Sequence, residues 1–264
     1  MKPIYLDLPY QSKVAIYTNS NSIIDTINKK YGIYCTKKLI SYDIQFIVDE
    51  YDDTYIVTTP KQKIFTSNPI SLIDRYLFEN NIYSPEVIAL HGAAVALNEK
   101  AYVFLASTTS GKTTLTSYLV SNGFKYITDD CVLINRSNFS ILPFCKPMHI
   151  REGGKDVLIK NRCLLNEMVF FFLGNDKRYV YTPDNIVLSP VQLSRIYFMS
   201  RSNNENRIYD ISTTEKIISL LKSPITEYSI SSEYLKTIIS LSEFNCQRLV
   251  YRDMRYVFDI ISNS

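Results

Sequence analysis

The chain has 264 residues and a formal net charge of +3, from 29 Lys and Arg and 26 Asp and Glu. Hydrophobic residues make up 46% and charged residues 21%, which excludes a disordered chain and allows a large buried core. The net charge is small and the basic residues form no run, so the sequence does not predict a nucleic-acid partner.

The cysteines, the histidines and the apolar runs limit which metal sites, membrane contacts and cellular locations the sequence allows. The five cysteines form no CxxC pair and no metal-ligand spacing, and two histidines exclude a His-rich metal site. The N-terminus has no long apolar segment behind a basic start, and the longest apolar run, MVFFFL, is too short to cross a bilayer. We therefore expect reduced thiols, no membrane partner and a cytoplasmic location.

The first part of the chain predicts a small α+β domain. Its alternating segments predict strands over 13–18, 43–51, 54–59 and 62–67, and helical spacing predicts helices over 20–32 and 67–81. In the second helix we expect Asn68 as the cap and Pro69 as the first residue. The pattern breaks near Pro85, so we expect domains over 1–86 and 87–264.

The second part predicts an α/β core. Two apolar strands flank a tight hairpin at 98–100, a helix covers 112–123, and strands over 124–128 and 131–134 flank an Asp pair. The Pro- and Gly-rich stretch 142–154 predicts a loop. Further expected elements are strands over 168–173, 180–182 and 195–200, helices over 213–223 and 231–244, and a last strand pair over 246–252 and 256–262.

The stretch ASTTSGKTT, residues 106–114, resembles a phosphate-binding loop with one change. The usual pattern is Gly, four residues, then Gly-Lys-Ser/Thr, and here Ala106 stands at the first glycine. Such a loop follows a strand and opens a helix, so that its backbone N–H groups and the helix N-terminus surround the phosphates. Residues expected to bind the phosphates are Thr108, Thr109, Ser110, Gly111, Lys112, Thr113 and Thr114.

Two expectations about this loop concern its geometry. Ala106 should have a φ that alanine tolerates, because the first glycine normally permits an unusual one. The N–H groups from Thr109 to Thr114 should form the cradle. A collapsed loop, with Lys112 buried away from any cavity, would instead favour a site that has lost its function.

Three further residues accompany the loop. Asp129 and Asp130 follow a strand one helix later, where carboxylates can hold Mg²⁺ or accept a proton. Taken alone, such a pair is more often a turn that caps local backbone. His91 begins the hairpin strand, and folding of the hairpin would bring it close to the loop. A lone His in an apolar stretch is more often packed than catalytic.

Together these residues resemble the catalytic core of the HPr kinase/phosphorylase family over residues 88–136. The shared features are a His-Gly pair, a hairpin, a loop ending Gly-Lys-Ser/Thr, a helix and an Asp-Asp pair. The resemblance implies an α/β fold with a core related to phosphoenolpyruvate carboxykinase. It also implies transfer of the γ-phosphate of ATP, with Mg²⁺, to a serine or threonine of a protein or peptide.

The resemblance also implies roles for single residues. Lys112 would contact the phosphates, Thr113 and Asp130 would hold Mg²⁺, and Asp129 would accept the hydroxyl proton. His91 would place or tune that carboxylate, which makes it a catalytic residue with Asp129 and Lys112. Members of the family assemble, so a homo-oligomer is compatible with the sequence.

The chain departs from the family pattern at two places besides Ala106. In HIREGG only Ile150 and Arg151 match the family's downstream signature, which leaves HPr itself and the dephosphorylating activity in doubt. Arg151 either reaches a phosphate or is a surface charge. The N-terminal domain differs from that of HPr kinases, and the short relatives that phosphorylate precursor peptides are more similar in size. We expect this domain to recognise the acceptor, through addition of a strand to its sheet.

Three alternatives stay open at this stage. The chain could be a nucleotide-binding regulatory module without transfer activity, or a kinase of a small-metabolite hydroxyl. It could also be a structural protein whose SGKTT is accidental.

Overall fold

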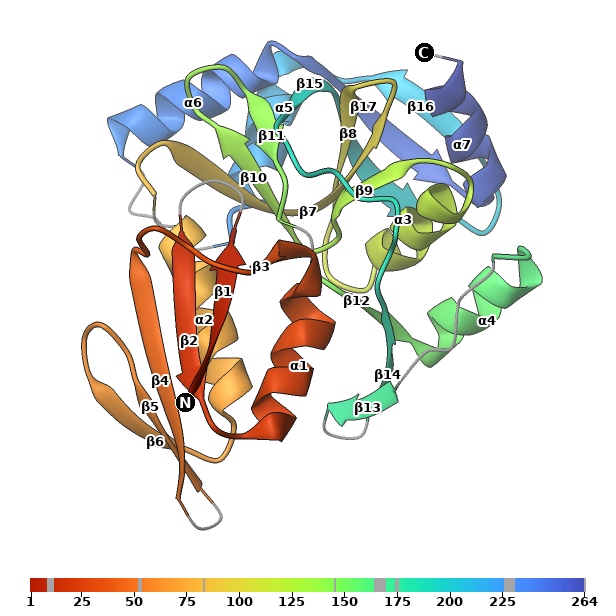
Figure 1. Ribbon diagram of the computed structural model, residues 1–264. Helices are drawn as coiled ribbons and strands as arrows, with labels where there is room; N and C mark the ends of the chain where they lie inside the picture. The colour runs from red at the N-terminus through yellow and green to blue at the C-terminus, as the bar shows by residue number, and fades with distance from the viewer. Residues whose placement is uncertain are drawn as a thin grey trace. The chain divides into compact units, whose positions relative to one another are not determined.

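The computed structural model describes residues 1–8, 12–51, 54–82, 84–144, 146–163, 170–173, 176–225 and 231–263. The fold is mixed α/β, with three sheets (Figure 1). The chain divides into two compact units, Met1–Ser84 and Pro85–Ser264. This division falls beside Pro85, where the sequence pattern breaks.

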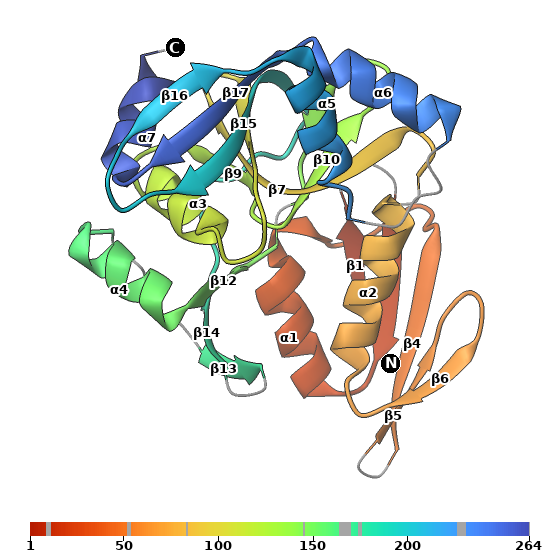
Figure 2. The ribbon, with the colours of Figure 1, turned by 180° about the vertical axis from the view of Figure 1, so that it is seen from behind.

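Unit 1 is a six-stranded sheet with the order β3-β1-β2-β4-β5-β6 and two helices. Strands β2 and β4 are parallel and α1 connects them, while the other pairs are antiparallel. Both helices lie on one face of the sheet (Figure 2). The elements are β1 (Lys2–Asp7), β2 (Lys13–Thr18), α1 (Asn21–Tyr31), a 3-10 turn (Gly32–Tyr34), β3 (Cys35–Thr36), β4 (Ile44–Tyr51), β5 (Thr54–Thr58), β6 (Lys63–Thr66) and α2 (Pro69–Ile82).

The start of α2 follows the sequence prediction. The Asn68 side chain accepts a hydrogen bond from the N–H of Ser71 at 3.0 Å, and Pro69 is the first helical residue. Ile73 and Leu77, four residues apart and therefore on one face of the helix, are fully buried. Strand β1, which the sequence analysis missed, lies beside β2.

Unit 2 is built on an eight-stranded sheet with the path β11-β10-β7-β8-β15-β17-β16, and β9 also pairs with β7. Strand β11 pairs with β15 as well, so five of these strands close on one another. The strands are β7 (Val87–Leu97), β8 (Lys100–Leu105), β9 (Lys125–Thr128), β10 (Cys131–Asn135), β11 (Ser140–Leu142), β15 (Val191–Arg201), β16 (Arg207–Asp210) and β17 (Asn245–Tyr251). The helices are α3 (Lys112–Ser121), α5 (Thr213–Leu221), α6 (Ser232–Ser242) and α7 (Met254–Ser262).

A third, small sheet has the order β12-β14-β13. Its strands are β12 (Met148–Arg151), β13 (Phe170–Leu173) and β14 (Asp176–Tyr181), and α4 (Glu152–Lys160) follows β12 directly. Helix α4 contacts α3, β12 and β14, so this sheet connects to the large one through α3.

Strand direction decides which loops share an edge of the large sheet. Strand β15 is parallel to both β8 and β17, and β7 is antiparallel to β8. Because β9 and β10 are also antiparallel to β7, they run in the same direction as β8. The carboxyl ends of β8, β9, β15 and β17 therefore lie at one edge, where open α/β sheets place their ligands.

Two predicted elements are wrong. Residues 256–262, predicted as a strand, belong to helix α7, whose buried residues Met254, Val257 and Ile261 follow the 3.6-residue period. The stretch 142–154, predicted as a loop, contains β12 and the first turn of α4. Gly154 lies inside that turn because a Cβ there would come within 2.8 Å of the Thr114 hydroxyl.

The core of unit 2 lies between the large sheet and its helices. Ile88, Leu90, Val103, Ile196 and Ile238 are fully buried members of one continuous apolar cluster. Within the described residues, no helix is both long and apolar enough to cross a membrane.

Candidate functional site

The candidate residues come together around His91 and Gly92 of strand β7, through the strands that pair with it on both edges. On one edge, Gly92 is the register partner of the last residue of β8. On the other edge, β9 ends at Thr128 and β10 begins at Cys131, opposite His91. The end of β8 and the turn between β9 and β10 therefore lie on either side of His91 and Gly92.

Gly92 is required here by close packing. A Cβ at this position would lie 2.5 Å from a methyl carbon of Leu105 and 2.8 Å from the carbonyl oxygen of Phe104. Real Cβ atoms do not approach this closely, so a larger residue would push β7 and β8 apart. The His-Gly pair thus combines a side chain for the site with a close approach of two strands.

The loop between β8 and α3 has the geometry that the sequence predicted at its first residue. Ala106 is not among the described residues with positive φ, whereas Thr109 has a φ of 65° and Gly111 a φ of 90°. The prediction that Ala106 lies at a φ alanine tolerates is therefore confirmed. The left-handed residues lie later in the loop, so the first position does not need glycine.

The backbone N–H groups of this loop have no partners among the residues that the structure describes. Among the described residues, no N–H from Thr108 to Thr114 donates a hydrogen bond of good geometry, and the first that does is Leu115, to Gly111 O at 2.9 Å. The Ser110 hydroxyl oxygen is also buried without a partner in the described part of the chain. Unpaired donors next to a helix N-terminus form a concentration of positive potential that suits an anion.

Lys112 folds back across its own loop. Its ammonium donates to the carbonyl oxygens of Ala106 and Ser107, both at 2.9 Å, and lies 3.2 Å from His91 Nε2. All three donors of the ammonium are thereby used, and the residue is only 7% exposed. Burial lowers the pKa of Lys112, and the nearby Asp130 and Asp129 oppose that shift.

His91 bridges Lys112 and Asp130. Burial lowers the pKa of His91 below its usual 6.5, the charge of Lys112 lowers it further, and Asp130 acts in the opposite direction. A neutral imidazole can accept from Lys112 at Nε2 and direct its Nδ1 hydrogen toward Asp130, whose Oδ1 is 3.4 Å away. This tautomer satisfies both contacts.

The two aspartates differ in their surroundings. The Asp130 side chain is 80% exposed. Asp129 is partly buried, and burial raises its pKa from 3.8 to about 6, against the effect of hydrogen bonds from Tyr126 and Thr113. The Tyr126 hydroxyl, 2.9 Å from Asp129 Oδ1, fixes the orientation of the carboxylate.

The hydroxyl of Thr113 and the Asp129 carboxylate are the oxygen ligands that come together here. No group of three His, Cys, Asp or Glu side chains suited to a metal ion occurs among the described residues. Mg²⁺ in phosphate sites takes one or two protein ligands with water and phosphate oxygens, and this pair fits such a role. The predicted metal ligand Asp130 instead lies beside His91, with its Oδ1 3.4 Å from the imidazole Nδ1.

Arg151, predicted to bind phosphate or to be a surface charge, is exposed at the end of β12. It pairs in register with Arg178 of β14. The helix that follows it approaches the loop, through the close contact of Gly154 with Thr114.

The sequence analysis missed a second group of residues beside the loop. Gly111 and Thr114 line a pocket together with residues from α4, the end of β15 and the turn between β17 and α7, namely Val157, Asn161, Arg201, Tyr251, Arg252, Asp253, Met254 and Arg255. The wrong strand assigned to 256–262 concealed this turn. A charged segment, RDMR, between two apolar runs was the available signal.

The fold and site define a mixed α/β protein with a cluster of polar side chains at the carboxyl ends of parallel strands. No protein-family model and no curated protein matches the sequence. Among solved structures the chain is similar to "Structure of the Hpr(Ser) kinase/phosphatase from Coxiella burnetii", with 10% identity and a TM-score of 0.33, over 66% of this chain and 94% of that one. This likeness is a distant structural relationship, so the chemistry below is derived from the residues of this chain alone.

Proposed function

We propose that the protein is a Mg-ATP-dependent kinase that transfers the γ-phosphate to a serine or threonine hydroxyl of a protein or peptide. The observation that carries the proposal is the loop between β8 and α3, with its unpaired N–H groups from Thr108 to Thr114. The loop precedes a helix and contains Lys112, whose ammonium lies 3.2 Å from His91 Nε2. On its other side, His91 Nδ1 lies 3.4 Å from Asp130 Oδ1. A phosphate chain can satisfy these N–H groups, whereas no described part of the chain does.

The buried Ser110 hydroxyl supports the same assignment. It has no partner among the described residues, and leaving a buried hydroxyl unpaired costs about 1–3 kcal/mol. A phosphate oxygen in the loop would give it one. Lys112 would then exchange its contacts with Ala106 O and Ser107 O for phosphate oxygens, and its charge would stabilise the transferring group.

The proton would move to Asp129. The acceptor hydroxyl loses its proton to the carboxylate while its oxygen forms a bond to the γ-phosphorus. The bond from that phosphorus to the β–γ bridging oxygen breaks, and ADP leaves. A carboxyl pKa of about 6 makes Asp129 a stronger base than an exposed aspartate, yet still ionised at neutral pH.

His91 would hold two of the charged groups near the transferred phosphate, the Lys112 ammonium and the Asp130 carboxylate. As a neutral imidazole between Lys112 and Asp130, it fixes the position of the ammonium and of one carboxylate without adding a positive charge. Mg²⁺, bound by Thr113 with Asp129 or Asp130, would supply positive charge to the β- and γ-oxygens. Proximity and charge then provide most of the acceleration, because a carboxylate is a weak base toward serine.

A second candidate, a nucleotide-binding regulatory module without transfer activity, is favoured by one observation. All three donors of Lys112 are used within the loop and by His91, and the residue is buried. A loop closed in this way must open before a phosphate reaches the ammonium. The two candidates share the binding step and differ only in transfer.

The test is incubation with ATP labelled on the γ-phosphorus, Mg²⁺, and small proteins and peptides encoded beside the gene, followed by mass spectrometry. The kinase proposal expects label on a serine or threonine with the wild-type protein and none with Asp129→Asn, while both bind ATP. Binding without transfer to any acceptor favours the regulatory module. Label on a small metabolite instead identifies a metabolite kinase.

Unit 1 is the part we propose for acceptor recognition. Strand β6 is an edge of its sheet, and Phe65 on this strand is exposed. An extended peptide can add to such an edge by main-chain hydrogen bonds, with specificity from side-chain contacts. The pairing of Thr59 with Gln62 and the register of β5 and β6 make Phe65 a residue whose N–H faces the free edge. Phe65→Pro in β6 should therefore reduce phosphorylation of a peptide acceptor and leave ATP binding unchanged.

A further inference from the structure

The first turn of α3 has two sides, and only one of them faces the catalytic carboxylates. Lys112 and Thr113 contact His91 and Asp129. Gly111 and Thr114, three residues apart and therefore on a common side of the helix, line a separate pocket of about 290 Å³. Neither His91 nor the Asp pair lines this pocket, so it lies on the other side of the loop from the proposed transfer chemistry.

The pocket is a product of strand order. The adjacent parallel strands β8, β15 and β17 end in the loop, at Arg201 and at Tyr251, and these three ends lie at one edge of the sheet (Figure 2). Val157 of helix α4 and Asn161, which follows the last residue of that helix, complete the lining. The volume is close to the lower end of the ~300–1,000 Å³ typical of small-molecule sites, which suits one part of a small ligand.

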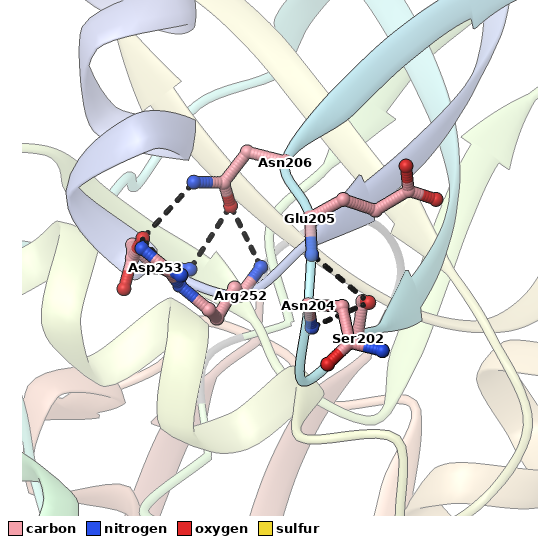
Figure 3. Close-up of polar contacts among 6 residues, drawn as sticks. All are labelled: Ser202, Asn204, Glu205, Asn206, Arg252 and Asp253. Atoms are coloured by element: carbon pink, nitrogen blue, oxygen red, sulfur yellow. Dashed lines mark hydrogen bonds and ion pairs between the residues drawn. The ribbon is translucent and has the colours of Figure 1, made fainter.

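One side chain fixes the turn between β17 and α7, which contributes Arg252 and Asp253 to the lining. The side-chain oxygen Oδ1 of Asn206 accepts hydrogen bonds from the backbone N–H groups of Arg252 and Asp253 at 2.7 and 3.0 Å (Figure 3). Its side-chain nitrogen Nδ2 donates to Asp253 Oδ2 at 3.0 Å. Beside it, Ser202 Oγ accepts from the N–H groups of Asn204 and Glu205 at 3.1 and 3.3 Å. The connection after β15 therefore holds the turn after β17 in place.

The contacts leave Asp253 with a defined orientation. Arg252 and Asn206 both donate to one oxygen, Oδ2. These hydrogen bonds, that of Arg252 first, lower the pKa of Asp253, so it is a carboxylate over the whole neutral range. The side chain is 48% exposed in the pocket wall, and Oδ1 makes no hydrogen bond with a described residue.

The positive charges of the pocket are not all neutralised. Arg252 pairs with Asp253 at 3.0 Å, and Arg255 pairs with Asp259 at 2.9 Å. Arg201 makes no ion pair with any residue that the structure describes. A guanidinium with no carboxylate partner among the described residues, beside this loop, suits the phosphate of a ligand that continues from the loop into the pocket.

We propose that this pocket receives the nucleoside end of the triphosphate, with the free oxygen of Asp253 accepting from the ribose hydroxyls and Arg201 facing the phosphate nearest Thr114. The inference rests on the proposed function, because it assigns the second half of the same ligand. Asn206 is a positioning residue, which acts by orienting Asp253. Tyr251, Met254 and Val157 form the apolar part of the wall, against which a base can pack.

The test compares ATP with inorganic tripolyphosphate, which has the phosphates but no nucleoside. In calorimetric titrations with Mg²⁺, the wild-type protein should bind ATP more tightly than tripolyphosphate. Asp253→Asn should weaken ATP binding roughly tenfold, or about 1.4 kcal/mol, because the ribose hydroxyls lose a charged acceptor. It should leave tripolyphosphate binding unchanged. Asn206→Ala should move the same ratio in the same direction.

The matched control is Asp210→Asn. Asp210, at the end of β16, is an exposed carboxylate that also accepts from a side-chain amide, that of Gln247 at 2.9 Å, and it does not line the pocket. It should leave both affinities unchanged. Melting temperatures within a few degrees of wild type for every variant show that folding is retained.

The outcomes separate the inference from the proposed function. If ATP binds no more tightly than tripolyphosphate, or if Asp253→Asn weakens both equally, the nucleoside pocket is wrong and the phosphate loop stands. If neither ligand binds at millimolar concentration, the proposed function fails and the inference fails with it.

Discussion

The two sides of the first turn of α3 are built by different means. On the side of Lys112, the candidate residues come from neighbouring segments of one hairpin and the strand pair beside it, and their side chains contact one another directly. On the side of Gly111, the pocket combines α4 with the ends of β15 and β17, and one asparagine holds the last turn in place. Local sequence motifs predict the residues on the side of Lys112, whereas those of the pocket come together only through the order of the strands in the sheet.

The largest expected effect is on the rate of phosphate transfer, for a substitution on the side of Lys112. Asp129→Asn should lower the rate of phosphate transfer at least about 100-fold, because it removes the proposed base. ATP affinity measured without Mg²⁺ should change by no more than about twofold, because the loop residues that hold the phosphates are intact. Below pH 6 the wild-type rate should fall roughly tenfold per pH unit, as the carboxyl with a pKa of about 6 becomes protonated. A variant that transfers at the wild-type rate would remove Asp129 from the mechanism.

Lys112 should affect binding of the phosphates whichever ligand carries them. Lys112→Met keeps a long side chain but loses the charge, and affinity for both ATP and tripolyphosphate should fall roughly 100-fold. Lys100→Met, at the opposite and exposed end of β8, is the control and should bind as wild type. Unchanged affinity in Lys112→Met would mean that the ammonium serves only to close the loop.

Gly111 lines the pocket and its N–H is also one of the loop donors proposed for the phosphates, so its replacement should affect both parts of the ligand. Its φ of 90° is unfavourable for alanine by about 1–2 kcal/mol, and a Cβ would lie 3.2 Å from the Tyr251 hydroxyl. Gly111→Ala should lower the melting temperature and weaken ATP and tripolyphosphate alike. Gly123→Ala has similar strain, with a φ of 99°, but nothing within 4 Å, so it should lose stability and keep both affinities.

The raised pKa of Asp129 should also make the free energy of unfolding depend on pH. Its folded-state pKa is about 6 and its unfolded value is 3.8, so folding disfavours the charged form. The free energy of unfolding of the wild-type protein should therefore fall as pH rises from about 4 to 6. Asp129→Asn should stabilise the protein at pH 7, on the order of 1 kcal/mol, and not at pH 3.5. Denaturant titrations at the two pH values measure this; equal effects would contradict a raised pKa.

The smallest effect concerns Ala106. Because Ala106 has no positive φ, glycine offers the loop no conformation that it needs. Ala106→Gly should lower the free energy of unfolding by about 0.5–1 kcal/mol through the entropy of the unfolded chain. Neither ligand should bind more tightly. A marked gain in affinity would show that alanine does restrict the loop.

The sequence predicted most of the elements around the loop because their signals are local. The hairpin, α3 and the strands beside the Asp pair follow hydrophobic periodicity and glycine positions. Helix α7 was assigned as a strand because YVFDIIS is rich in β-branched and aromatic residues, although its buried residues follow a helical period. In α4 the glycines indicated a loop, since the approach of Thr114 is a tertiary contact that no local pattern reveals.

The same distinction applies to the site. His91, Lys112 and the two aspartates were found within about 40 residues of chain by motif and spacing. Arg201, Asn206 and Asp253 were not, because strands β15 and β17 become neighbours only through sheet pairing. Asn206 and Asp253 are 47 residues apart and belong to no common motif.

The most direct test of the two-sided loop is amide NMR with tripolyphosphate and ATP, each with Mg²⁺. Both ligands should shift the N–H signals from Thr108 to Thr114, and ATP alone should also shift those of Arg252 and Asp253. If the loop signals do not move at millimolar ligand, or if both ligands shift the two regions alike, the arrangement of phosphates on one side and nucleoside on the other is contradicted.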